Sequence, residues 1–193
     1  MNKKRKKKGF TLVELLIVVG IIGVLVAISI PILNKQLEKS REAHDIYTMR
    51  AIASLAVDYY YSGYITSAGI TNEELKKELK WWPNNNDPKR CNAAGVYIPS
   101  TGKFKPTRDG VKPYGKGTKV DGGTKFSEGS NTKGTYVPNL DYTNAVCMIS
   151  IYPAGDNPHI DIYWKNNITG NTSYVGGQAS QDNPNYSYRI PLN

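Results

Sequence analysis

The chain has 193 residues, with 25 Lys or Arg against 16 Asp or Glu and a formal net charge of +9. Six of the cations lie in the first nine residues, and without them the balance is 19 against 16, so the charge gives little support to a general nucleic-acid-binding role. With two His, two Cys and no phosphate loop, nucleophile elbow or metal-spaced cluster, we expect no cofactor, no metal site and no enzymatic activity.

An apolar segment follows the basic N-terminus. Residues 15–33 carry no charged side chain, and the segment is close to the roughly 20 residues that a helix needs to cross a bilayer core. Because basic residues stay on the cytoplasmic side, we expect the N-terminus inside and the C-terminal domain outside. The small residue Gly9 precedes the apolar core, whereas the cleavage site of a secretory signal follows it.

Three residue types in this segment are unusual for a simple anchor. Glu14 is a carboxylate that would cost about 2.5–3.5 kcal/mol at mid-membrane, so it either reaches the interface or has an intramembrane partner. Gly20 and Gly23 each weaken a helix by roughly 1 kcal/mol relative to Ala. Pro31 removes one backbone N–H. This half of the helix is therefore expected to be deformable or closely packed against other helices.

The order Gly-Phe-Thr-Leu-Val-Glu at residues 9–14, followed by the apolar run and Pro31, resembles the class III signal of type IV prepilins and pseudopilins. The resemblance implies that a prepilin peptidase cleaves between Gly9 and Phe10 and N-methylates the Phe10 amine. It also implies that Glu14 meets the Phe10 amine of a neighbouring subunit during assembly. Gly23 and Pro31 would bracket a helix region that unwinds in the filament.

This resemblance predicts a structural subunit of a type IV pilus. The subunit would be inserted in the cytoplasmic membrane and later form an extracellular surface filament with copies of itself or with other pilins. The other expected partners are the prepilin peptidase and the pilus assembly machinery. A pseudopilin of a type II-secretion-like or DNA-uptake machine remains an alternative, and so does a membrane-tethered binding domain that never polymerises.

The chain divides into five predicted segments. Residues 1–9 are a leader that is removed, 10–33 a transmembrane or filament-core helix, and 34–62 its amphipathic continuation. Residues 63–133 hold a short helix, begun by a capping box at Thr71 and Glu74 and ending near Lys80, and a long Gly- and Lys-rich loop. Residues 134–193 form the sheet of a globular head. In the amphipathic part the expected buried stripe is Leu33, Leu37, His44, Tyr47, Ala51, Leu55 and Tyr59.

The last third of the sequence has strand patterns. Residues 142–152, 159–165, 172–175 and 186–190 alternate or run apolar between turn-rich connectors, and 96–98 and 103–105 are shorter fragments. We therefore expect an α+β, pilin-like fold, in which the long N-terminal helix packs on an antiparallel sheet. His44 and His159 have no ligand spacing around them and are expected to be ordinary surface or helix-face residues.

Two features of the head have open interpretations. Residues 100–133 contain eight Lys or Arg and three acids, interleaved with aromatic residues. This composition suits sequence-independent binding of single-stranded nucleic acid, although a solvated surface loop is the favoured interpretation. Cys91 and Cys147 could form a disulfide, because an exported domain with an even number of cysteines often does. The alternative is two separate free thiols.

Overall fold

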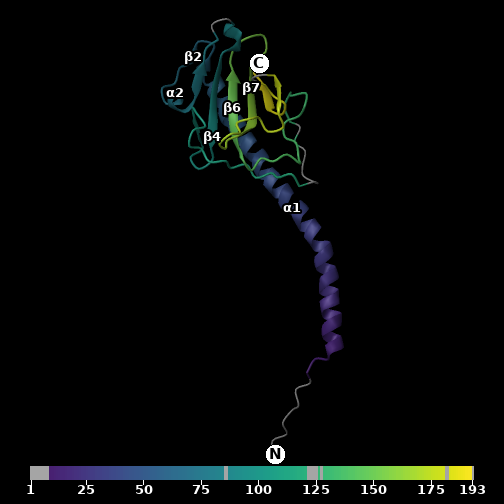
Figure 1. Cartoon of the computed structure of the whole chain (residues 1–193). Helices are drawn as coiled ribbons and strands as arrows, with labels where there is room; N and C mark the ends of the chain where they lie inside the picture. Colours follow the sequence, from purple (N-terminus) through teal and green to yellow (C-terminus); the bar gives the residue numbers. More distant parts are fainter. Residues whose placement is uncertain (1–8, 85–86, 121–125, 127, 181–182, 193) are drawn as a thin grey trace, which may run out of the picture.

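The computed structural model describes residues 9–84, 87–120, 126, 128–180 and 183–192. One long helix projects from a head of strands and loops, and its N-terminal half stands clear of that head (Figure 1). Apart from Gly9, the predicted leader lies outside the described residues. The arrangement confirms the expected α+β fold, with a long N-terminal helix packed on an antiparallel sheet.

Helix α1 spans Leu12–Tyr61, a continuous run of 50 residues that measures about 75 Å at 1.5 Å per residue. Pro31 lies inside the helix without ending it. The helix ends at Ser62, whose N–H donates to the Asp58 carbonyl oxygen at 2.9 Å. Gly63 then takes a left-handed φ of 72°, which glycine adopts without the Cβ clash of other residues.

The main sheet has the strand order β10–β7–β6–β4–β3, and β5 pairs with the far end of β4. Every neighbouring pair is antiparallel, and β6 and β7 pair along their full length. The elements after α1 are β1 Ile65–Thr66, β2 Gly69–Ile70, α2 Leu75–Glu78, β3 Lys80–Trp82, the 3₁₀ turn η1 Pro88–Arg90, β4 Asn92–Ile98, β5 Lys103–Lys105, β6 Ala145–Tyr152, β7 His159–Asn166, β8 Gln178–Ser180, β9 Asn183–Pro184 and β10 Tyr188–Pro191.

The C-terminal half of α1 lies across this sheet and contacts β6 and β7. Met49 and Ile52 are fully buried on the helix, and Ile149 and Ile162 are fully buried on the two strands. Alternate strand residues face the helix because successive side chains of a strand point to opposite faces. Each buried side chain of this size contributes about 1.5–3 kcal/mol, so this apolar seam holds the helix on the sheet.

The sheet contains strands from outside residues 134–193, the segment that was predicted to form it. β3, β4 and β5 come from residues 63–133, and β4 lies between β6 and β3. Ala93, Ala94 and Gly95 have low strand propensity and conceal the first half of β4 in the sequence. A Cβ added at Gly95 would lie 3.2 Å from the Glu78 carbonyl oxygen, so the glycine also allows α2 to approach β4 closely.

Two smaller expectations for the head are wrong. In the described chain, residues 172–175 form no strand but only an isolated bridge to β7. Helix α2 is a single turn, and its first N–H groups are capped by Asn72, whose Oδ1 accepts from Glu74 at 3.1 Å and Leu75 at 3.0 Å. Thr71 does not cap α2, because its hydroxyl donates to the Gly63 carbonyl oxygen at 2.9 Å.

The buried face of α1 also differs from the predicted stripe. Leu37 is 51% exposed and Tyr47 is 71% exposed, while Leu33 and His44 are exposed as well. The prediction holds in part at its C-terminal end, where Leu55 and Tyr59 are half-buried against the core. Its first half is wrong because it assumed that acidic residues face the solvent, whereas three of them face the head. The buried positions are Glu38, Glu42, Asp45, Ile46, Thr48, Met49, Ile52, Ala53 and Ala56.

Cys91 and Cys147 are buried free thiols, which corrects the expected disulfide. The antiparallel register pairs Ala93 of β4 with Ile151 of β6, and therefore places Cys91 six residues from the position opposite Cys147. At about 3.3 Å per residue this separation is about 20 Å. A disulfide requires Cα atoms within about 7 Å, so the sheet register keeps the two thiols apart.

Candidate functional site

The start of α1 is organised by Thr11 and Glu14. The backbone N–H and the hydroxyl of Thr11 both donate to Glu14 Oε2 at 2.8 Å. In return, the Glu14 N–H donates to Thr11 Oγ1 at 3.2 Å. This reciprocal arrangement is a capping box, which satisfies N–H groups that have no partner inside the helix. Its sequence signal is a Thr followed three residues later by Glu. The prediction for Glu14 rested on membrane depth and on a neighbouring subunit's amine, and it missed this local capping role.

Gly9 and Phe10 precede the helix and are not part of it. Both are exposed, and Phe10 is 89% exposed. The peptide bond between them therefore lies outside the hydrogen-bonded helix, in the kind of exposed terminal chain that proteases cut most readily.

The apolar half of α1 has no part of the head packed against it. By length and composition the helix could cross a membrane, and the apolar window that meets this test is entirely unburied. Soluble monomers rarely expose apolar patches of more than a few hundred Å², so this surface requires lipid or another protein. The exposed side chains include Leu16, Val19, Ile22, Leu25, Ile28 and Ile32.

Gly20, Gly23 and Pro31 all lie in this uncovered half. Apart from the adjacent residues and the nearby backbone of the helix itself, no described atom lies within 4 Å of a Cβ added at Gly20 or Gly23, so another chain could approach the backbone closely there. Pro31 has no N–H to donate to the carbonyl oxygen four residues earlier. The helix is nevertheless intact in this region, and its unwinding in a filament stays a prediction. A shallow groove here is lined by Ile17, Gly20, Ile21, Val24 and Leu25.

The head half of α1 carries three buried acids, Glu38, Glu42 and Asp45, which we call the acid clamp. Each is at most 1% exposed. Their spacing of four and three residues places them on one helix face, and this face continues into the apolar seam that packs on β6 and β7.

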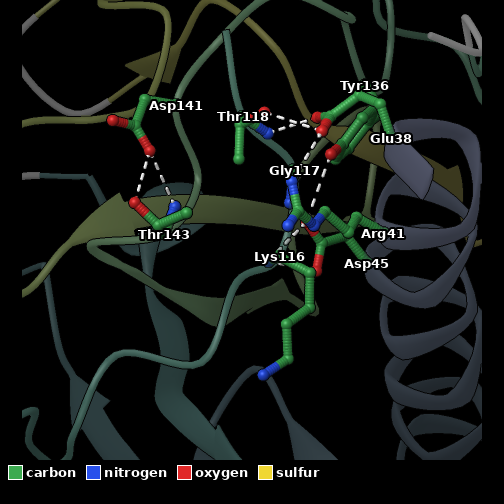
Figure 2. Close-up of polar contacts among 9 residues, drawn as sticks. All are labelled: Glu38, Arg41, Asp45, Lys116, Gly117, Thr118, Tyr136, Asp141 and Thr143. Atoms are coloured by element: carbon green, nitrogen blue, oxygen red, sulfur yellow. Dashed lines mark hydrogen bonds and ion pairs between the residues drawn. The ribbon is translucent and has the colours of Figure 1, made fainter. Parts of the chain in front are cut away.

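Asp45 holds a loop segment that lies more than 70 residues away in the sequence. Its carboxylate accepts hydrogen bonds from the Lys116 N–H at 2.9 and 3.0 Å and from the Gly117 N–H at 2.8 Å. The Tyr136 hydroxyl donates to the same carboxylate at 3.1 Å. Figure 2 shows these groups converging on Asp45, while the Lys116 side chain extends away from the cluster.

Glu38 continues the same contact about two turns earlier on α1. The Thr118 N–H donates to its Oε1, and the Thr118 hydroxyl donates to its Oε2 at 2.6 Å. Arg41 Nη1 lies 3.4 Å from Glu38 Oε2 (Figure 2). Three consecutive N–H groups of the loop, from residues 116 to 118, are thus satisfied by side chains of one helix face.

The carboxylates of the acid clamp are buried, and the groups that donate hydrogen bonds to Glu38 and Asp45 are mainly uncharged N–H and hydroxyl groups. Burial raises the pKa of Asp45, and the hydrogen bonds from Gly117 and Lys116 oppose this shift. Burial and the nearby Asp45 carboxylate raise the pKa of Tyr136 well above its ordinary value. A buried charge is tolerated only when hydrogen bonds replace its hydration, so the loop is a necessary partner of Glu38 and Asp45.

Two close contacts define the shape of the loop at the clamp. A Cβ added at Gly117 would overlap the Tyr136 hydroxyl. The Tyr136 ring in turn stacks on Tyr142, with ring centroids 4.2 Å apart and an interplanar angle of 12°. The absence of a side chain at Gly117 therefore allows the loop to lie directly on the acids.

The histidines lie at unrelated places. His44 Nδ1 lies 3.8 Å from Asp45 Oδ1 with its side chain 53% exposed, and His159 Nδ1 lies 2.7 Å from the Asn157 carbonyl oxygen. Among the described residues, no group of three or more His, Cys, Asp or Glu could hold a metal ion. Helix α1 thus has an uncovered apolar surface in its first half and a buried contact with the head in its second half.

The start of the chain matches a known protein-family model. Residues 4–30 match the family model described as the prokaryotic N-terminal methylation motif. The match contains the Gly9–Phe10 junction, Glu14, Gly23 and most of the uncovered helix. No solved structure matches the chain.

Several curated proteins are similar over a third to a half of the chain. A fimbrial protein of Neisseria meningitidis is 34% identical over 36% of this chain and 45% of its own length. The type IV major fimbrial protein FimA of Dichelobacter nodosus is 36% identical over 34% and 41%. The fimbrial protein EcpC of Eikenella corrodens is 32% identical over 52% of each chain.

The chain thus spans about half the length of the curated relatives that it matches. The similarity includes the methylation motif and the apolar helix, and the fold combines that helix with an antiparallel sheet. The chain thus carries the prokaryotic N-terminal methylation motif and is similar in sequence to type IV major pilins and other fimbrial proteins.

Proposed function

We propose that the chain is the precursor of a pilus subunit that is processed at its N-terminus and polymerised through α1. In this proposal a prepilin peptidase cleaves between Gly9 and Phe10 on the cytoplasmic side and methylates the new Phe10 amine. The basic leader keeps the N-terminus inside, so the head lies outside the membrane. The observation that carries the proposal is the uncovered apolar half of α1, which begins directly after this junction.

Type IV pilins are structural proteins, and the chain is a structural pilin subunit rather than an enzyme. Its assembly partners in the proposal are copies of itself or other pilins, brought together by the pilus assembly machinery. The relatives FimA and PilE are named as major pilins, which favours a pilus subunit over a pseudopilin.

Glu14 has a specific role in this assembly. Its carboxylate lies at the same end of the helix as the future Phe10 amine, and Thr11 already orients it. An amine and a carboxylate are each costly in hydrocarbon, and pairing them between subunits offsets much of both costs. The pair would therefore set one register between neighbouring helices, while the segment bracketed by Gly23 and Pro31 unwinds to fit the filament.

The experiment that tests the proposal is the intact mass of the subunit in surface material sheared from producing cells. We expect a species that begins at Phe10 and carries one added methyl group. A Glu14→Ala variant should be processed but absent from the sheared fraction, whereas Glu74→Ala, which removes an exposed acid of the head, should assemble normally.

Three results would contradict the proposal. Full-length chain found only in membranes would indicate a tethered domain that is never cleaved. Processed chain that is never shed would indicate a pseudopilin. Normal filaments from the Glu14→Ala variant would show that the carboxylate does not set the subunit register.

A further inference from the structure

The positive charge of the head is concentrated in one stretch. Residues 98–119 contain six Lys or Arg and a single acid, a net charge of +5. Without the leader the chain carries 19 cations and 16 acids, so the remainder of the processed chain has a net charge of −2. The basic stretch is therefore a local feature of the head.

A groove of about 500 Å³ lies within this stretch, between the β4–β5 connection and residues 110–114. Most of its lining is apolar, and two lysines also line it. A volume of this order is typical of ligand pockets, which combine apolar walls with a few polar groups. The lining residues are Ile98, Pro99, Ser100, Lys105, Gly110, Val111, Lys112, Pro113 and Tyr114.

Hydrogen bonds fix the walls of the groove in place. The Asn167 side-chain amide donates to the carbonyl oxygens of Arg108 at 3.1 Å and Val111 at 2.7 Å. Arg108 Nη1 donates to the Asn166 carbonyl oxygen at 3.0 Å, and the Tyr114 hydroxyl donates to a backbone carbonyl oxygen of β4 at 2.8 Å. The groove is therefore formed before any ligand arrives.

The two lysines remain available for an anion. Lys105 Nζ donates to the Asp109 carbonyl oxygen, which leaves two of its three N–H donors. Lys112 is exposed. In the part of the chain that the structure describes, neither lysine forms an ion pair with a carboxylate.

We propose that this groove binds single-stranded nucleic acid, with Lys105 and Lys112 on the phosphate backbone and a base against the apolar wall around Val111 and Tyr114. Cationic grooves with apolar or aromatic platforms are the general solution for binding single strands without sequence preference. A duplex keeps its bases stacked inside and cannot present one to the wall. The proposal does not depend on filament assembly, because the groove lies within one subunit.

The test is fluorescence anisotropy with a labelled single-stranded DNA oligonucleotide and the full-length chain in non-ionic detergent. All chains in the comparison carry a leader whose six cations are replaced by Gln, so that the leader cannot bind the probe. The test variant is Lys105→Ala with Lys112→Ala. The matched control is Lys76→Ala with Lys77→Ala, which removes two exposed lysines of α2 outside the groove.

We expect the groove variant to bind at least tenfold more weakly than the control variant, with unchanged thermal unfolding of the head. Two lysine–phosphate contacts predict a slope of about −1.4 in log affinity against log salt, or about sevenfold weaker binding at 200 mM than at 50 mM salt. An abasic oligonucleotide of equal charge should bind at least fivefold more weakly, because it cannot stack on the wall.

Each other result overturns the proposal. Equal losses of oligonucleotide affinity in the groove variant and the control variant would show that binding depends on the total charge of the head and not on the groove. Equal affinity for the abasic strand, for a DNA duplex or for inorganic polyphosphate would show that no base enters the groove. Absence of binding at 50 mM salt by a folded chain would show that the basic stretch is only a solvated surface.

Discussion

The two halves of α1 belong to one continuous helix but meet opposite environments. The first half is apolar all round and uncovered by the head. The second half buries one face, and that face begins with Glu38, Glu42 and Asp45 before its apolar residues. In the subunit, the apolar surface of the first half is thus exposed, while three acids of the second half are buried. This is the reverse of the usual distribution on the helix of a soluble protein.

The difference shows that burial on this helix depends on available partners more than on polarity. Glu38 and Asp45 are buried because a loop presents N–H groups to them. The leucines and valines are exposed because the described part of the head does not cover them, and their proposed partners, lipid or other subunits, lie outside the monomer. Each half can therefore be perturbed without the other, and the following changes test that separation.

The largest effect should come from Leu25→Lys, in the middle of the apolar half. A lysine at the membrane centre costs about 2.5–3.5 kcal/mol, so membrane retention and surface fibres should be lost while the head unfolds at an unchanged temperature. Alkaline extraction of membranes measures the first effect and near-ultraviolet circular dichroism the second. Leu33→Lys is the control, because a lysine near the end of the segment can extend its amine to the interface. Full retention of Leu25→Lys would refute the role of this half as the anchor.

Asp45→Ala should strongly destabilise the head. The change leaves the N–H groups of Lys116 and Gly117 and the Tyr136 hydroxyl without an acceptor, at a cost of about 3 kcal/mol in the free energy of unfolding. Urea unfolding in mild detergent measures it. Asp58→Ala removes an exposed acid of the same helix and should change the value by less than about 0.5 kcal/mol. Equal effects of the two variants would mean that the clamp contributes no specific stability.

Gly117→Ala should cost about 2 kcal/mol of unfolding free energy, because its Cβ overlaps the Tyr136 hydroxyl. The same substitution in a Tyr136→Phe background should cost less, since the overlapping oxygen is gone. A double-mutant cycle of urea unfolding measures the coupling. If the cost is the same in both backgrounds, the glycine is required for another reason.

The smallest effect should come from Thr11→Val. It removes the hydroxyl from the capping box with Glu14, and we expect the helix end to lose about 1 kcal/mol. Hydrogen exchange of the Glu14 amide should become faster, with no change in the head. Thr11→Ser retains the hydroxyl and should exchange like the parent chain. Faster exchange in the serine variant as well would assign the effect to side-chain packing.

The sequence was a good guide where a feature depends on neighbouring residues. The charge-free run to Leu33 marks the uncovered helix, and the largely apolar and aromatic runs of β6 and β7 mark the centre of the sheet. Both signals are local, because helix and strand periodicity appear within a dozen residues.

The acid clamp could not be predicted in this way. Asp45 and Gly117 are 72 residues apart, and a sequence read for local polarity assigns an acid to the solvent. The first half of β4 was missed for a related reason, since Ala93 and Gly95 fit the sheet through close packing rather than strand propensity. The separation of Cys91 and Cys147 likewise follows from the register of β4 and β6. This register cannot be inferred from the number of cysteines in the sequence.

The long sequence separation within the acid clamp has a consequence for biogenesis. While the chain is being synthesised, Glu38 and Asp45 leave the ribosome well before residues 116–118 exist to receive them. During that interval they are hydrated charges directly after the apolar run, and they oppose entry of the second half of α1 into the bilayer. The same carboxylates therefore mark the edge of the membrane in the nascent chain and become internal ligands once the loop folds onto them.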